Sequence, residues 1–203
     1  MQALGGGKII GLDATVRTGA LMVRKDSTIQ SVSELRNVPI AVTWHAGTFY
    51  AAIEALEAAG VPFEEIKLVH ANDRLDALVS GATEAAALME PLVSRAKAAG
   101  ARTLADLRWR GGIVAGNDVD EETAAKLRRA PNRAIAWLRE NEDRSRQEVL
   151  RDLSPEQRER GMMPELVGVK NYRAEEFKEK VDWMLDRGFL KDAPDYAEVV
   201  RSK

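Results

Sequence analysis

Short apolar segments alternate with amphipathic segments through the first half of the chain. The apolar segments have the length and composition of buried strands, and in the segments between them apolar residues recur at helical spacing. The segments expected to form strands are 8–13, 18–24, 39–43, 66–70, 85–89, 101–105 and 113–116, and those expected to form helices are 29–36, 49–60, 73–80 and 92–99. Strands that alternate with helices of this length predict βαβ units and a parallel sheet, and therefore an α/β fold.

Beyond residue 116 nearly all of the pattern is helical. Segments 120–140 and 174–187 place apolar residues on one helix face, and Pro131 is expected to kink or split the first of them. The stretch between them is very polar, and residues 154–156 (Ser-Pro-Glu) have the order of a helix start. The second half of the chain is therefore expected to be a helical C-terminal region.

The composition narrows the class of protein. The chain has 203 residues, with 30 Lys and Arg against 32 Asp and Glu, and so a net charge of about −2. This balance argues against nucleic acid as a partner, because a nucleic-acid footprint needs a concentrated basic face. No apolar stretch is long enough to cross a membrane. Cysteine is absent, which excludes disulfides, thiolate metal sites and thiol nucleophiles.

The first residues show no basic region followed by an apolar run, so they do not form an export signal. We therefore expect either that the protein stays inside the cell or that a leader has been removed or never included. Nothing in the sequence points to a cofactor or a metal. No serine, cysteine or second histidine lies at a spacing that would complete a nucleophilic triad or a metal site with His45.

The order of the elements resembles that of a known family, the type 2 periplasmic binding proteins. The resemblance rests on TGALMVRKDSTIQSVSELRNVPIAV (18–42), IKLVH (66–70), LDALVSGATEAAALMEPLVSRA (75–96) and WMLDRGFLKDAPDYAEVV (183–200). The branch it resembles binds nitrate, taurine, alkanesulfonates and thiamine pyrimidine precursors. Two positions depart from the usual pattern: Glu84 stands where that branch shows Asp, and Asn37 where a Gly-Lys turn is common.

The resemblance implies a two-lobed α/β fold with an incomplete first lobe. Residues 39–111 would be a complete second lobe, and residues 1–38 with 112–203 a partial first lobe. Family members begin with about two further βαβ units, which have no counterpart here. Our hypothesis is that a second chain or a swapped homodimer supplies the remaining wall of the ligand cleft, or that the chain is a fragment.

The best candidate for a binding site is the turn between the strand at 39–43 and the helix that follows it. In an open parallel sheet, ligands bind beyond the carboxyl ends of the strands. The N–H groups of Gly47, Thr48 and Phe49 would then be free to bind an anion, with the helix dipole in support. Trp44 or Phe49 would add a stacking surface. The plainer alternative is that Thr48 only caps the helix and Trp44 fills a gap.

Polar residues at neighbouring strand ends are further candidates. His45 and His70 are each either a ligand partner or a structural residue. Asn72 or Asp73 is first of all a helix N-cap.

Arg74 would pair with a ligand carboxylate or sulfonate, or more simply form a surface ion pair. Glu90 would bind an amine or ring N–H, or close a salt bridge at the hinge. Arg17 and Thr18 belong to the hinge or to the cleft. The residues expected to bind the ligand are therefore Trp44, His45, Gly47, Thr48, Phe49, Asn72 and Glu90, with no catalytic residue and no metal ligand among them.

The resemblance implies the solute-binding component of an ABC-type importer. Such a protein is periplasmic, works with an ABC transporter permease, and would bind a small organic anion or heteroaromatic ligand in an interlobe cleft that closes about a hinge. Because no signal peptide is visible, the alternative is an intracellular enzyme on the same fold, similar to a desulfinase, a decarboxylase or an enzyme of thiamine-pyrimidine synthesis. With no cysteine, His45 would be its reactive group. A ligand sensor without a transport role is a third hypothesis.

Overall fold

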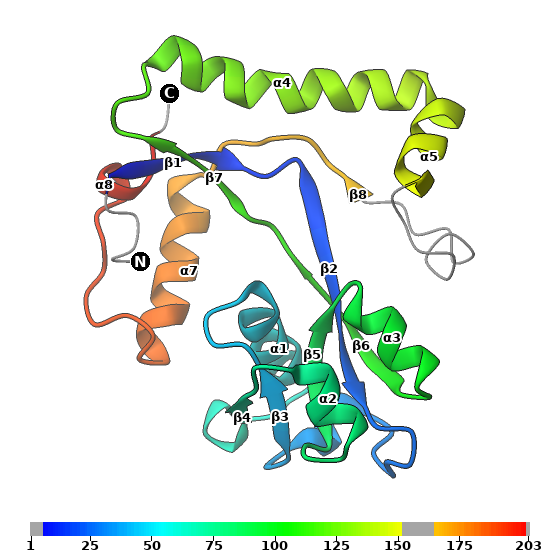
Figure 1. Cartoon of the computed structure of the whole chain (residues 1–203). Coiled ribbons are helices and arrows are strands. Elements are labelled where there is room, and N and C mark those ends of the chain that lie inside the picture. Colours follow the sequence, from blue (N-terminus) through cyan, green and yellow to red (C-terminus); the bar gives the residue numbers. More distant parts are fainter. Residues whose placement is uncertain (1–5, 152–164, 202–203) are drawn as a thin grey trace. The chain divides into compact units, whose positions relative to one another are not determined.

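The computed structural model describes residues 6–151 and 165–201 (Figure 1). These residues form two units, which are joined by the peptide bonds 16–17 and 109–110. Residues 17–109 form one of them, called the sheet unit below, and the described residues before 17 and after 109 form the other, called the helical unit. The Ser-Pro-Glu signature at 154–156 lies outside the described residues.

The sheet unit is built on a mixed sheet with the strand order β4-β3-β5-β2-β6. Its strands are β2 (Thr15–Val23), β3 (Pro39–Val42), β4 (Lys67–His70), β5 (Ala85–Met89) and β6 (Arg102–Trp109). β3 runs parallel to β4 and β5, as expected, whereas β2 is antiparallel to both of its neighbours, β5 and β6. The predicted parallel βαβ pairing is therefore present in β3, β4 and β5, and the antiparallel part of the sheet comes from the strand that brings the chain into the unit and the strand that takes it out, which lie side by side in opposite directions.

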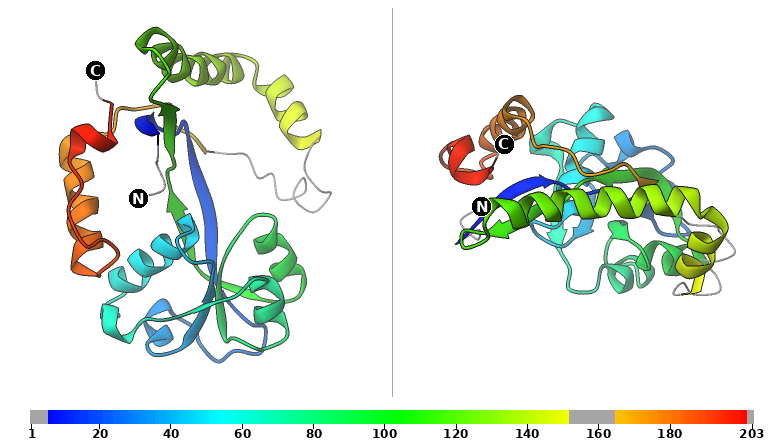
Figure 2. Two further views of the ribbon diagram at one scale, coloured as in Figure 1. Left: turned by 60° about the vertical axis from the view of Figure 1, so that its left-hand side comes forward. Right: turned by 90° about the horizontal axis from the view of Figure 1, so that it is seen from above.

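Helices cover both faces of this sheet. They are α1 (Gly47–Ala58), α2 (Arg74–Val79) and α3 (Leu92–Ala98), with single 3-10 turns at Val32–Leu35 and Phe63–Glu65. Figure 2 shows α1 on one side of the sheet and α3 on the other. Ala20 and Met22 of β2 belong to the core under α2 and α3. Because side chains alternate along a strand, the equally buried Leu21 and Val23 point to the opposite face.

The sheet unit begins at residue 17, whereas the complete lobe was expected to begin at residue 39. Residues 17–38 group with the sheet unit, since β2 lies inside its sheet with β5 on one side and β6 on the other. β6 also extends to Trp109, past the expected end of this strand at Ala105.

The helical unit has a small antiparallel sheet and four helices among its described residues. Its elements are β1 (Gly7–Leu12), β7 (Gly112–Gly116), β8 (Glu165–Leu166), α4 (Glu121–Glu140), α5 (Glu142–Arg151), α7 (Ala174–Asp186) and α8 (Tyr196–Val199). β1 pairs with β7, and β8 pairs with Thr15 and Val16 of β2. The α/β class and the helical character of the C-terminal region are confirmed.

Pro131 lies inside α4 and does not split it. A proline leaves the carbonyl four residues earlier without its helical donor. That carbonyl belongs to Leu127, whose residue is 43% exposed, so water can take the vacant position. No helix in the described ranges combines the length and the apolar character needed to cross a membrane.

Arg110 holds the helical unit together where the chain enters and leaves it. Its guanidinium donates to the carbonyl oxygens of Leu12 and Gly168, at 3.3 and 2.6 Å, and also to that of Asp13. The N–H of Asp13 in turn donates to Gly111 O at 2.8 Å. One side chain therefore fixes the segment between β1 and β2 beside the start of β7.

We expect the substitution Leu78→Ala to destabilise the sheet unit strongly. Leu78 is fully buried between α2 and the sheet, and removing a buried leucine side chain costs about 2–5 kcal/mol through lost burial and the cavity left behind. The neighbouring substitution Val79→Ala is the control, because Val79 is 54% exposed and a change there is expected to stay within about 0.5 kcal/mol. The measurement is the free energy of unfolding in urea, and equal losses for both variants would contradict this packing.

Candidate functional site

The candidate site lies at the start of α1, where the chain leaves the carboxyl end of β3. His45 has a φ of 59°, in the left-handed region that non-glycine residues seldom adopt, and it turns the chain into the helix. Ala46 is the N-cap residue, and its side chain makes no capping bond. The helix therefore begins without the side-chain cap that satisfies its first amides in many proteins.

Among the described residues the first two amides of α1 have no acceptor, but the third has one. Phe49 N–H donates to Ala46 O at 2.9 Å, so the expectation of a free amide at Phe49 is wrong. Within residues 6–151 and 165–201, no hydrogen bond is formed by the N–H of Gly47 or Thr48. Gly47 is partly exposed and Thr48 is buried, so the Gly47 amide is the more accessible of the two. An anion at this position would satisfy donors that the helix itself cannot.

Arg74 lies against this first turn. Its Nη1 donates to Thr48 Oγ1 at 3.0 Å and to Ala87 O at 2.7 Å, and so connects α1, α2 and β5. The Thr48 hydroxyl is therefore engaged with Arg74 and does not cap α1. Sequence analysis favoured a surface ion pair for Arg74, but among the described residues it has no salt-bridge partner.

The charge of Arg74 is partly desolvated. Burial lowers the pKa of its guanidinium, and the neighbouring carboxylate of Asp73 opposes that shift. An arginine side chain nevertheless stays protonated in proteins, so the group remains a cation. Because Oγ1 and N of Thr48 are separated by only a few covalent bonds, this cation lies close to the amide of Thr48 in the first turn of α1.

Aromatic side chains form one wall beside the helix start. Trp44 is 44% exposed and stacks on His70, with ring centroids 6.3 Å apart and planes inclined by 13°. Phe49 meets the Trp44 ring edge-on at 5.3 Å, but Phe49 is 2% exposed and belongs to the core. Of the two stacking candidates, Trp44 is thus the one with an accessible ring.

Both histidines are hydrogen-bonded within the chain. His45 Nδ1 lies 3.0 Å from the Tyr50 hydroxyl, and His70 Nε2 lies 3.2 Å from Asn72 Oδ1. Burial raises the pKa of the Tyr50 hydroxyl, which keeps that group protonated. Tyr50 carried no signal in the sequence beyond its place in the helix.

The remaining candidates have local structural roles. Asp73 caps α2 through its contact with Asp76 N at 2.9 Å, as expected. The Glu90 carboxylate accepts a hydrogen bond from Ser94 N at 3.2 Å in the first turn of α3. Arg17 and Thr18 are exposed on β2. No cluster of three metal-binding side chains occurs in the part of the chain that the structure describes.

Trp109 is the residue at this site that sequence analysis missed. A Cβ built on Gly47 would lie 2.1 Å from Nε1 of its indole, so Trp109 rests directly on the first residue of α1. The indole also reaches Gly19 of β2, where a Cβ would lie 3.3 Å from Cζ3. The two glycines were the signal available in the sequence, since both provide space for a large neighbour.

Comparison with known proteins identifies the fold. No family model matches the sequence, and no curated protein matches it either. Among solved structures, the sulfonate-binding protein SsuA from Methylobacillus flagellatus KT superposes with a TM-score of 0.71 at 16% identity, over 97% of this chain and 66% of that chain. The alkanesulfonate-binding protein SsuA from Xanthomonas axonopodis pv. citri, bound to MOPS, gives 0.73 at 18% identity, over 96% and 73%.

A third similar structure is a mutant of the desulfurization enzyme DSZB in complex with biphenyl-2-sulfinic acid. It superposes with a TM-score of 0.65 at 15% identity, over 100% of this chain and 79% of that chain. This chain therefore spans between about two thirds and four fifths of the length of these three proteins. At such identities the likeness concerns the fold, and the chain has the fold of the type 2 periplasmic binding proteins that its sequence resembles.

Proposed function

We propose that the start of α1 binds the anionic group of a small organic sulfonate or sulfinate. The observation that carries the proposal is the hydrogen bond from the Arg74 guanidinium to Thr48 Oγ1, in the first turn of a helix where the N–H of Gly47 makes no hydrogen bond among the described residues. Arginine has five N–H donors, and the two contacts of Arg74 both use Nη1. Its other donors and the Gly47 N–H would bind the oxygens of the anion, and charge-assisted hydrogen bonds of this kind are strong.

The similar structures support this choice of ligand class. Two of them are named as sulfonate-binding proteins, one of which holds MOPS, itself a sulfonate, and a third holds an aryl sulfinate. Sulfonates and sulfinates share a compact anionic group with several acceptor oxygens. Trp44, with its accessible ring, would contact the organic part of the ligand.

On this basis we propose a solute-binding role in an ABC-type importer. The partners would be the ligand and a permease, and the location would be the periplasm, as in the similar proteins named as periplasmic. The similar chains are longer than this one, and a second chain, a second copy of this chain or a further part of the same protein would complete the first lobe.

An enzyme on the same fold is the alternative, because DSZB superposes over the whole chain. A desulfinase would use water to break the C–S bond of a sulfinate, releasing bisulfite and leaving hydrogen on carbon. Without cysteine, the available acid–base pair is His45 with Tyr50. Release of sulfite from biphenyl-2-sulfinate that is lost in His45→Ala would favour this alternative over the binding role.

We expect the substitution Arg74→Met to weaken the binding of methanesulfonate by about 10- to 100-fold. Hydrogen bonds to charged groups contribute about 1.5–3 kcal/mol, and each 1.4 kcal/mol is about a tenfold change in affinity. The measurement is isothermal titration calorimetry at low ionic strength, with urea unfolding to show that the variant is folded.

Arg95→Met is the matched control, since Arg95 is exposed on α3. It should bind methanesulfonate as the wild type does. Equal losses in both variants, or no binding by the wild type, would contradict an anion site at Arg74.

A further inference from the structure

The indole of Trp109 lies face-on against the first turn of α1. The Cβ position of Gly47 is 2.1 Å from Nε1 and almost equally distant from the two ring neighbours of that nitrogen, at 2.5 Å from Cε2 and 2.6 Å from Cδ1. If the Cβ position lay in the ring plane along the direction of the N–H bond, it would be much farther from the two carbons than from the nitrogen. Gly47 therefore sits above the ring face, and the N–H bond of Trp109 points past it.

Gly47 is required for space and not for its backbone conformation. Its φ is not in the left-handed region, where glycine has its conformational advantage. The atoms nearest to its missing side chain all belong to Trp109. Gly19 is constrained by Leu88 O as well, at 2.4 Å from its Cβ position. At position 47, therefore, it is the indole of Trp109 that excludes a residue larger than glycine.

The rest of the indole surface has no specific partner. Among the residues that the structure describes, the side chain of Trp109 makes no hydrogen bond, ring contact or cation–π contact. Its side chain is nevertheless held in place by Gly47 and Gly19 and is only partly buried. A fixed, partly exposed aromatic ring that lies against the first residue of α1, the helix whose first turn Arg74 contacts, has the composition of a ligand-binding wall.

We propose that Trp109 makes the site selective for sulfonates or sulfinates that carry an aryl group directly next to the anionic group. This inference rests on the proposed anion site at Arg74 and Gly47. With the anionic group held there, an aromatic ring attached to it lies within reach of the indole, whereas a methyl group is too small to cover the indole surface. Contacts between aromatic rings add to affinity beyond the area that they bury.

The experiment compares benzenesulfonate with methanesulfonate, which carry the same anionic group. We expect the wild type to bind benzenesulfonate about tenfold more tightly in calorimetric titrations, and Trp109→Leu to reduce this ratio to about threefold or less. Affinity for methanesulfonate should change by less than about threefold, since the anion contacts remain. Trp109→Phe, which keeps an aromatic ring, should retain most of the preference.

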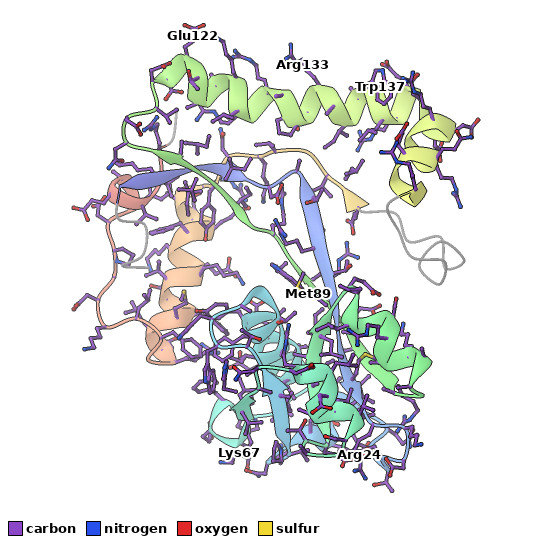
Figure 3. The ribbon with its side chains drawn as sticks, in the orientation of Figure 1. Arg24, Lys67, Met89, Glu122, Arg133 and Trp137 are labelled. Carbon is purple, nitrogen blue, oxygen red and sulfur yellow. The ribbon has the colours of Figure 1, made fainter. Side chains whose placement is uncertain are left out.

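Trp137→Leu is the matched control. Trp137 is also partly exposed, at 43%, but it lies on α4 in the helical unit and contacts Arg144 (Figure 3). Its replacement should leave both affinities unchanged. An unchanged ratio in Trp109→Leu, or a wild type without aryl preference, overturns the inference while the anion site stands. A wild type that binds neither sulfonate overturns the anion site and the inference together.

A second variant tests the contact on which the inference depends. Gly47→Ala places a methyl group on the indole face, so we expect it to displace Trp109 and lower the benzenesulfonate preference as Trp109→Leu does. In a Trp109→Leu background the same Gly47→Ala change should alter the preference by less than about twofold, because neighbouring residues that act together are not additive. Full additivity of the two changes would contradict the role of this contact.

Discussion

The candidate site depends on two hydrogen bonds that the Arg74 guanidinium donates, one to Thr48 and one to Ala87. Through a single nitrogen they join the first turn of α1, the start of α2 and the middle of β5. Among the described residues this partly buried cation has no salt-bridge partner, although the neighbouring Asp73 carboxylate opposes the fall in its pKa. Because charges removed from water are normally paired, an anionic ligand beside Arg74 would be stabilised there. The unpaired amides of α1 add to the same positive field.

Trp109 and Gly47 define the surroundings of the helix start that carries these unpaired amides. The indole fills the volume that any side chain at residue 47 would need, and two glycines on different elements fix its position. Trp109 is also the last residue of β6, so the wall of the site ends where the sheet unit ends. On the proposed account Arg74 would set the affinity for the anionic group and Trp109 the preference for an aryl group, so substitutions at these two residues would alter the two properties separately.

Periodicity predicted most elements of the fold but not how they pair. The helix at 49–60 and the strands at 39–43 and 85–89 follow from runs of apolar residues, and each is present within a few positions. The direction of β2 does not follow, because an apolar run such as Ala20–Val23 is equally suited to parallel and antiparallel neighbours. The alternation of strands and helices predicted the α/β class, and the family resemblance added the expectation of two lobes.

The candidate site stays a prediction, but the structure corrects some of the contacts expected in it. The turn after β3 was identified from its place at a strand end, but the burial of Phe49 could not be read from a helix start that is apolar on several sides. Arg74 was named as a partner for a ligand carboxylate or sulfonate, but its contact with Thr48 was not predicted because the two residues lie 26 positions apart. Trp109 was missed because its strand was expected to end at Ala105. Such contacts are set by tertiary packing, which local patterns do not encode.

The most direct test of the anion site is an NMR titration of the ¹⁵N-labelled protein with methanesulfonate. Free amides at a helix start and a guanidinium N–H respond strongly when an anion binds to them. Our account predicts that the backbone amide of Gly47 and the Nε–H of Arg74 show the largest shift changes and saturate together. Saturating shifts confined to other residues, with Gly47 and Arg74 unmoved, would contradict it.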